Sequence, residues 1–215
     1  MIMTGLSTKE IELKIDLINA TNYEQLLDLV KPVSEPIEQQ NIFFDTPDHS
    51  LSRRKLALRL RLQGNEAFIA LKGARSKAPD GLANRFELEM KISIDIAKVY
   101  LDNGFKSDDL PTEMICKLGK EIKDLEFRKY LSFSNRRLMA SHSISDADYI
   151  LEIDKTTFED DSTDYEIEIE LTNENEYESV LLAVKALLDT NKINWNFQSK
   201  SKMGRALIKA GLNDH

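Results

Sequence analysis

Near the N-terminus, charged side chains occupy every second position, and these residues are the first candidates for a binding or catalytic role. In the run Glu10-Ile11-Glu12-Leu13-Lys14, charged and aliphatic residues alternate. A β-strand points successive side chains to opposite faces, so the two glutamates and the lysine share one face. Taken alone, the pattern is equally typical of the solvated face of an amphipathic strand.

The same alternation recurs further along the chain, with the signs of the charges sorted by segment. One later segment carries only bases at its alternate positions, and two others carry mostly acids. These residues are Arg59 and Arg61, then Glu87 and Glu89, then Glu166, Glu168 and Glu170. A solvated face has no need to sort its charges in this way. We therefore infer that the charged faces look at one another across an interior.

The elements that must position these residues follow from hydrophobic periodicity and turn signals. We predict strands at 10–15, 41–45, 55–63, 67–72, 84–94, 125–140, 149–158 and 164–171, and a short one at 195–197. We predict helices after the capping box Thr21-Asn22-Tyr23-Glu24, twice between 95 and 123, after Asn173 and at 202–210. Residues 73–81 form a polar loop.

About eight strands with charged alternate positions predict an α+β fold built on an eight-stranded antiparallel β-barrel, or tunnel. Its interior is charged, and flanking helices cover part of the aliphatic outer face. The sequence has no repeats or low-complexity tracts, so we expect a single domain over residues 1–215.

Composition excludes several classes of partner. The formal net charge is −8, which argues against nucleic acid and against an anionic membrane surface. No stretch approaches the roughly 18 apolar residues of a membrane span, and we see no signal peptide. The single cysteine, Cys116, rules out an internal disulfide, and we expect it to be a small buried hydrophobe in a cytoplasmic protein. Nothing in the sequence predicts an oligomeric state.

The charged residues divide by sign into two sets that suit two kinds of ligand. The bases are Lys14, Arg59, Arg61, Lys72, Arg137 and Lys202. The acids are Glu10, Glu12, Glu87, Glu89, Asp154, Glu168 and Glu170. Unpaired buried ions are costly, so we expect a wet tunnel that binds a polyanion on its bases and a divalent cation on its acids. Carboxylates without cysteine or histidine suit Mg²⁺ or Mn²⁺. We place the three histidines, His49, His142 and His215, in turn-like or terminal positions without a catalytic role.

The ordered motifs of the chain resemble those of the CYTH superfamily, also called triphosphate tunnel metalloenzymes. The resemblance covers essentially the whole chain. It begins with Glu10-x-Glu12-x-Lys14 and continues through Phe43-Phe44-Asp45-Thr46-Pro47, Leu58-Arg59-Leu60-Arg61, Leu71-Lys72, Arg85-x-Glu87-x-Glu89, Phe133-Ser134-Asn135-Arg136-Arg137, Leu151-Glu152-Ile153-Asp154, 165–170 and Ser201-Lys202-Met203-Gly204-Arg205.

The resemblance implies a small-molecule triphosphate as substrate and assigns roles to particular residues. Lys14, Arg59, Arg61, Lys72, Arg137 and Lys202 would bind the phosphates. Glu10, Glu12, Asp154, Glu168 and Glu170 would hold the metal, with Glu12, Asp154, Glu168 and Glu170 as the catalytic carboxylates. Glu87, Glu89 and Glu166 would be further tunnel-facing residues, with Glu166 farther along the tunnel.

The implied activity is metal-dependent hydrolysis of the terminal phosphoanhydride of a triphosphate. Inorganic tripolyphosphate, a nucleoside triphosphate and thiamine triphosphate stay open as substrates. Two alternatives are an ATP-cyclising activity like that of class IV adenylyl cyclases and a non-catalytic polyphosphate-binding module. The residues 156–163 lack the glycine of the cyclase-like run, and a pure phosphate binder gains nothing from carboxylates that repel its ligand. Hydrolysis is therefore favoured.

Overall fold

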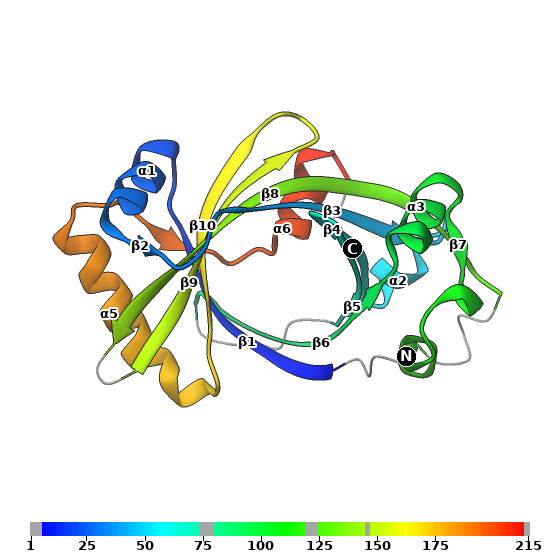
Figure 1. The fold of residues 1–215 in the computed structure, drawn as a ribbon, viewed down its shortest axis with the longest axis horizontal. Coiled ribbons are helices and arrows are strands. Elements are labelled where there is room, and N and C mark those ends of the chain that lie inside the picture. Colours follow the sequence, from blue (N-terminus) through cyan, green and yellow to red (C-terminus); the bar gives the residue numbers. More distant parts are fainter. Residues whose placement is uncertain (1–5, 74–79, 119–123, 145–146, 213–215) are drawn as a thin grey trace.

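A closed antiparallel sheet is the centre of the structure, which is a computed structural model describing residues 6–73, 80–118, 124–144 and 147–212. Within these residues, eight strands pair in the order β10-β9-β8-β3-β4-β5-β6-β1, and β1 pairs with β10 to close the ring (Figure 1). The ring strands are β1 Leu6–Asp16, β3 Ile37–Asp45, β4 Ala57–Gln63, β5 Glu66–Lys72, β6 Leu82–Ile92, β8 Glu126–Ile144, β9 Ala147–Phe158 and β10 Thr163–Glu170. The short strands β2 Lys31–Pro32, β7 Phe105–Lys106 and β11 Asn196–Phe197 pair at the margins. The predicted eight-stranded barrel is confirmed.

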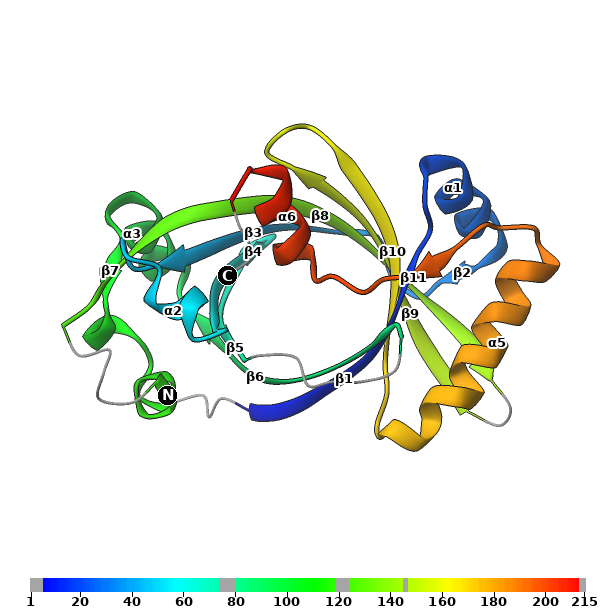
Figure 2. The same cartoon turned by 180° about the vertical axis from the view of Figure 1, so that it is seen from behind.

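The helices lie outside the ring, at its two ends and near its opening (Figures 1 and 2). They are α1 Ala20–Leu29, α2 Ser50–Arg53, α3 Ile94–Asn103, α4 Thr112–Leu118, α5 Tyr177–Thr190 and α6 Lys202–Lys209, with single 3₁₀ turns η1 Ser107–Asp109 and η3 Glu174–Glu176. Helices α1 and α5 cover one outer flank of the barrel, whereas α2, α3 and α4 cover the other.

The aliphatic face of each ring strand turns outward and makes the hydrophobic cores. On β1, Leu13 and Ile15 are fully buried and belong to one core with Val184 and Leu188 of α5. On the other flank, Leu58 and Leu60 of β4 belong to a second core, which is completed by α3 and α4. Burying these side chains contributes about 1.5–3 kcal/mol each, so the outer cores stabilise a barrel whose inner face is polar.

Most predicted elements are present, and the differences have local causes. Helix α1 begins after Asn19, whose side chain accepts a hydrogen bond from the Asn22 backbone N–H, so the capping box predicted at Thr21 is wrong. Helix α5 begins as predicted beyond Asn173, which caps η3. The polar loop predicted at 73–81 falls largely on 74–79, outside the described residues.

Two smaller predictions are also corrected. Cys116 is exposed on α4, because Met114 and Leu118 form the buried face of that short helix. His142 lies within β8 and not in a turn, whereas His49 is in a turn-like position before α2 and His215 lies outside the described residues. None of the described helices is long and apolar enough to cross a membrane.

Gly81 lies where β11 packs against β1, so a substitution at this residue tests how tight that packing is. Its φ of +77° lies in the left-handed region, and an added Cβ would lie 2.6 Å from Phe197 and 3.0 Å from the Lys14 carbonyl oxygen. Because both strain and overlap result, we expect Gly81→Ala to lower the free energy of unfolding by about 2–4 kcal/mol in urea denaturation. Gly64, with φ +55° and no atom near its Cβ position, is the control, and Gly64→Ala should cost only about 1 kcal/mol. Equal losses in the two variants would contradict this packing.

Candidate active site

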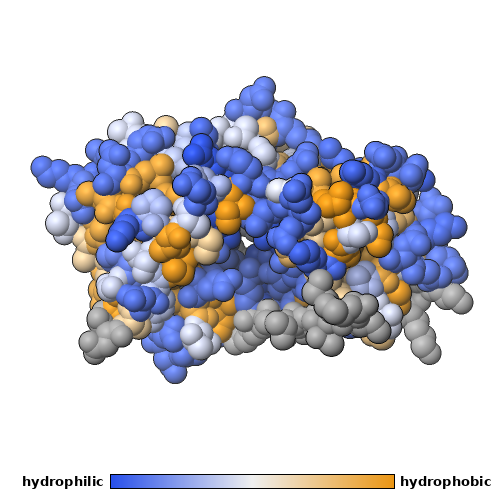
Figure 3. Space-filling view, in the orientation of Figure 1, coloured by the Kyte–Doolittle hydropathy of each residue, from blue (hydrophilic) through white to orange (hydrophobic). Residues whose placement is uncertain are grey.

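The inner faces of the ring strands enclose a cavity of about 1060 Å³. Figure 3 shows a hollow lined with hydrophilic residues on the face viewed there. Twelve of the fourteen residues predicted to face the tunnel line this cavity. They are Glu10, Glu12, Lys14, Arg59, Arg61, Lys72, Glu87, Glu89, Arg137, Glu168, Glu170 and Lys202. The period-2 alternation therefore brings charges from strands far apart in sequence into one volume.

Two predicted residues, Asp154 and Glu166, lie behind this lining. Both are buried, and neither borders the cavity. Register explains their position, because Glu166 pairs with Asp154 across β10 and β9 at a level covered by the start of α6. Glu166 is therefore not the tunnel-facing residue predicted from its alternation.

Acids and bases alternate on the wall formed by β5, β6 and β1. Arg85 Nε lies 2.5 Å from Glu10 Oε2, and Arg85 Nη2 lies 3.3 Å from Glu12 Oε1. Lys72 Nζ lies 2.6 Å from Glu87 Oε2 and 3.3 Å from Glu10 Oε1. Burial opposes ionisation of Glu10, yet Lys72 and Arg85 hold its pKa well below the usual range. Burial, reinforced by nearby arginines, lowers the pKa of Lys72 to about 8.

The two arginines of β4 differ in how well they are compensated. Arg59 Nη2 lies 2.7 Å from Glu89 and 3.2 Å from Glu87. Among the residues that the structure describes, the nearest carboxylate to Arg61 is that of Glu89, 3.9 Å from Nη1. Burial, together with the positive charges of Arg59 and Arg137, lowers the pKa of Arg61 to about 10. This wall is therefore short of negative charge beside Arg61.

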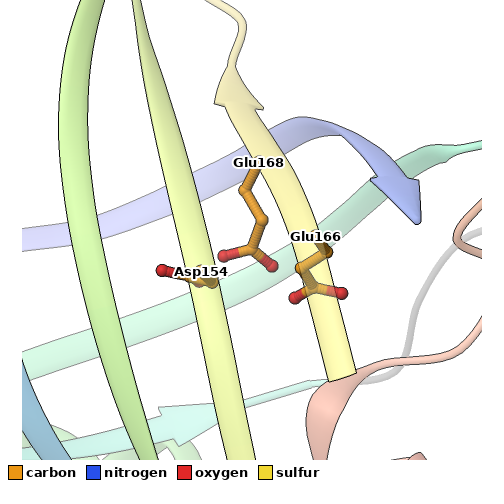
Figure 4. A group of neighbouring side chains, drawn as sticks. All are labelled: Asp154, Glu166 and Glu168. Carbon is orange, nitrogen blue, oxygen red and sulfur yellow. The ribbon is translucent and has the colours of Figure 1, made fainter. Parts of the chain in front are cut away.

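On β9 and β10, three carboxylates gather around the ammonium group of Lys202. Figure 4 shows Asp154, Glu166 and Glu168 on these two neighbouring strands, and one oxygen from each lies within 4.8 Å of the others. Lys202 Nζ lies 2.8 Å from Asp154 Oδ2 and 2.9 Å from Glu168 Oε1, and it also contacts Glu166. These carboxylates raise the pKa of Lys202 against the opposing effect of burial.

Further bases contact the same carboxylates. Arg137 forms a fork with Asp154, with its Nε and Nη2 atoms 2.8 and 2.6 Å from the two oxygens, and reaches Glu168 at 2.7 Å. Lys14 also contacts Glu168. Arg205 Nη2 lies 2.9 Å from Glu166. The Asp154–Glu166–Glu168 group is thus neutralised by the chain itself.

A second group of acids, Glu10, Glu12 and Glu170, is only partly neutralised. Glu12 and Glu170 pair across β1 and β10, and within the described part of the chain Glu170 makes no ion pair or hydrogen bond. Burial, reinforced by the charges of Glu10 and Glu12, raises the pKa of Glu170. Carboxylate oxygens with no sulfur or nitrogen ligand among them are the donors that a hard divalent cation prefers, although the acids of the described residues that lie close enough to share an ion are Asp154, Glu166 and Glu168.

Several functional residues are absent from the predicted set. Arg85 and Glu152 line the cavity, as do the amides Gln39, Asn41 and Asn135. Arg85 and Glu152 could have been found, because they continue the alternation of Glu87 and Asp154. The uncharged amides carry no such signal in the sequence.

Comparisons with known proteins agree with this geometry. The sequence profile of the CYTH domain matches residues 8–202, so the chain belongs to the CYTH family. Among solved structures, HpAC1 from Hippeastrum, a proposed adenylyl cyclase with a dominant triphosphatase activity, is 25% identical. The match has a TM-score of 0.81 and covers 95% of this chain and 97% of that one.

Two further structures share the fold. A proposed adenylate cyclase from Bacillus halodurans is 25% identical over 92% of this chain and 97% of that one, with a TM-score of 0.64. The PH1819 protein from Pyrococcus horikoshii is 20% identical over 93% and 99%, with a TM-score of 0.62. Two uncharacterized proteins from Mycobacterium tuberculosis strains are 33% identical over 88 residues, which is 39% of this chain and only 16% of their own length.

Glu152 makes the stability of the site depend on pH. Burial raises its pKa from 4.5 to about 7, reinforced by Glu168 and Asp154 and opposed by Arg137. The folded state therefore binds more protons than the unfolded state between pH 4.5 and 7, so stability falls as the pH rises through this window.

A glutamine at this position cannot ionise, so Glu152→Gln should remove that fall. We expect this variant to exceed the parent in free energy of unfolding by about 1–3 kcal/mol above pH 7, with the difference shrinking toward pH 4.5. Urea denaturation across the pH range measures this difference, with the exposed Glu38→Gln as control. A pH-independent difference would show that Glu152 is ionised throughout.

Proposed function

We propose that this protein is a metal-dependent triphosphatase that hydrolyses the terminal phosphoanhydride of a triphosphate. The observation that carries the proposal is the division of uncompensated charge within one cavity. Arg61 on β4 lacks a close counter-ion, and Glu170 lies on β10, four strands away around the ring of eight in the described structure. A ligand that carries phosphoryl charge and a divalent cation would neutralise both.

Relatives support the phosphoanhydride chemistry. The chain belongs to the CYTH family, and HpAC1 has a dominant triphosphatase activity although it was proposed as a cyclase. We carry that activity over as a proposal and favour inorganic tripolyphosphate, a nucleoside triphosphate or thiamine triphosphate as substrate.

In the proposed reaction the bases bind and orient the phosphates. Arg59 and Arg61 present planar forks of N–H donors, which suit non-bridging phosphoryl oxygens. Arg137 and Lys72, which now bind carboxylates, would share their donors with the substrate. Positioning and charge neutralisation supply most of the rate in phosphoryl transfer, so these residues need not react covalently.

The acids would bind the metal and order the attacking water. We assign Glu10, Glu12 and Glu170 as the carboxylates that hold Mg²⁺ or Mn²⁺, with Glu168 beside them. When bound, such an ion neutralises phosphoryl charge and lowers the pKa of a bound water. Asp154 acts in this scheme through Arg137 and Lys202, both of which it holds in place.

A substrate panel tests the proposed function. We expect phosphate release from at least one of tripolyphosphate, thiamine triphosphate and ATP with Mg²⁺ or Mn²⁺, and none after exhaustive chelation. Phosphate and cyclic AMP are measured in the same samples. Cyclic AMP as the main product from ATP would favour the cyclase instead, and full activity with chelator would remove the metal from the proposal.

Matched variants on opposite walls test the division of roles. Glu170→Gln should lower turnover at least about tenfold, since even outer-shell partners of a metal are worth about 10- to 100-fold, while tripolyphosphate binding in chelator stays equal or tightens. Arg61→Gln should weaken that metal-free binding about 10- to 100-fold and leave apo thermal stability equal or higher, because it removes a poorly compensated charge. Calorimetric titration and steady-state rates measure both effects. Equal losses of metal-free affinity would contradict the assignment.

A further inference from the structure

Asn41 on β3 is a buried amide that borders the cavity. Its residue is 3% exposed, and its Oδ1 accepts a hydrogen bond of 3.4 Å from Arg61 Nε. A guanidinium group can only donate hydrogen bonds, so the amide oxygen must face Arg61. The Nδ2 group of Asn41 then has no acceptor among the residues that the structure describes.

The other amides of this wall are satisfied. Thr156 donates to Asn135, Asn135 donates to Gln39, and Gln39 donates to Gln63, over distances of 2.8, 3.2 and 3.1 Å. This chain of hydrogen bonds uses one donor and one acceptor of each inner amide. Asn41 stands outside it, so its free donor is a local feature and not a general property of the wall.

The side chains beside Asn41 are also hydrogen-bond donors. Asn41 pairs in register with Arg61, and the next inward residue of β3, Phe43, pairs with Arg59. Arg59 Nε is buried and has no hydrogen-bond partner within the described residues. A buried donor without an acceptor costs about 1–3 kcal/mol, and this cost applies to Arg59 Nε. The Nδ2 group of Asn41 opens onto the cavity, and a ligand rich in acceptor oxygens would satisfy both donors. The positive charge of Arg61, whose nearest carboxylate among the described residues lies 3.9 Å away, favours an anionic ligand.

We propose that Asn41 is a substrate-binding residue whose Nδ2 group donates to a non-bridging phosphoryl oxygen held by Arg59 and Arg61. The inference rests on the proposed function and deepens it. The absence of charge on Asn41 is as important as its donor: a carboxylate at this position would compensate Arg61 internally and repel the phosphate. Asn41 therefore keeps this wall selective for an anion.

The substitution Asn41→Asp separates this role from a structural one. Aspartate keeps the acceptor for Arg61 and the size of the side chain, so it should leave the fold intact while it tests the need for a neutral donor at this position. In the proposed role the donor is lost and a repelling charge is added. Calorimetric titration of inorganic tripolyphosphate in chelator should then show binding about 10- to 100-fold weaker than the parent, with equal or higher apo thermal stability.

Two further variants complete the experiment. Gln40→Glu makes the same change of charge at the neighbouring residue of β3, which is exposed on the opposite face of the strand and does not line the cavity, and its affinity should stay within about threefold of the parent. Asn41→Leu removes the donor without adding charge, and it should weaken binding about tenfold even if the aspartate variant does not fold. Parental affinity in a folded Asn41→Asp or Asn41→Leu protein overturns the role of Asn41 alone. A parent protein that binds no tripolyphosphate overturns the proposed function as well.

Discussion

Buried charge inside a closed sheet is the constraint on which the structure depends. Because the eight strands form a closed ring, most of the inward-facing side chains of their described residues point into one cavity. Removing an ion from water costs several kcal/mol unless a counter-ion and hydrogen bonds replace the hydration. The chain meets this cost mostly by itself: Arg85, Arg137 and Lys202 each contact two or three carboxylates. The outer aliphatic cores supply the stability that such an interior does not.

Compensation is incomplete at two places, and these give the cavity its proposed chemistry. Around Lys202 the acids and bases balance, so the Asp154–Glu166–Glu168 group is a structural counter-ion cluster as much as a place for an added cation. The Glu170 carboxylate and the Arg61 guanidinium lack close partners. The unpaired groups carry opposite signs on different strands, which matches a ligand that brings both signs of charge together.

The barrel and most of its charged lining were predictable from the sequence because both depend on a period of two. Once Glu12 faces inward, Glu10 and Lys14 must do so too, and closure of the sheet then places Glu170 opposite Glu12. The pairings escaped prediction because they are non-local: nothing near Lys202 in sequence indicates Asp154 or Glu168. The helix start was predicted at Thr21 and lies after Asn19, because an asparagine side chain caps a helix N-terminus at least as well as threonine. Asn41 was missed because a neutral amide looks ordinary until its unsatisfied donor is seen.

The internal ion pairs also couple the two halves of the proposed site. Lys14 and Lys202 cannot give their full charge to a phosphate while they neutralise Glu168. Any cation that takes over the charge of the carboxylates would release these bases toward the substrate. By linkage, the substrate must then favour binding of that cation to the same extent. Arg61 and Asn41 do not take part in this exchange of counter-ions, because neither is paired with a close carboxylate that a metal could take over. They would bind the anion with or without metal, whereas Lys14 and Lys202 would strengthen that binding only once the acids are occupied.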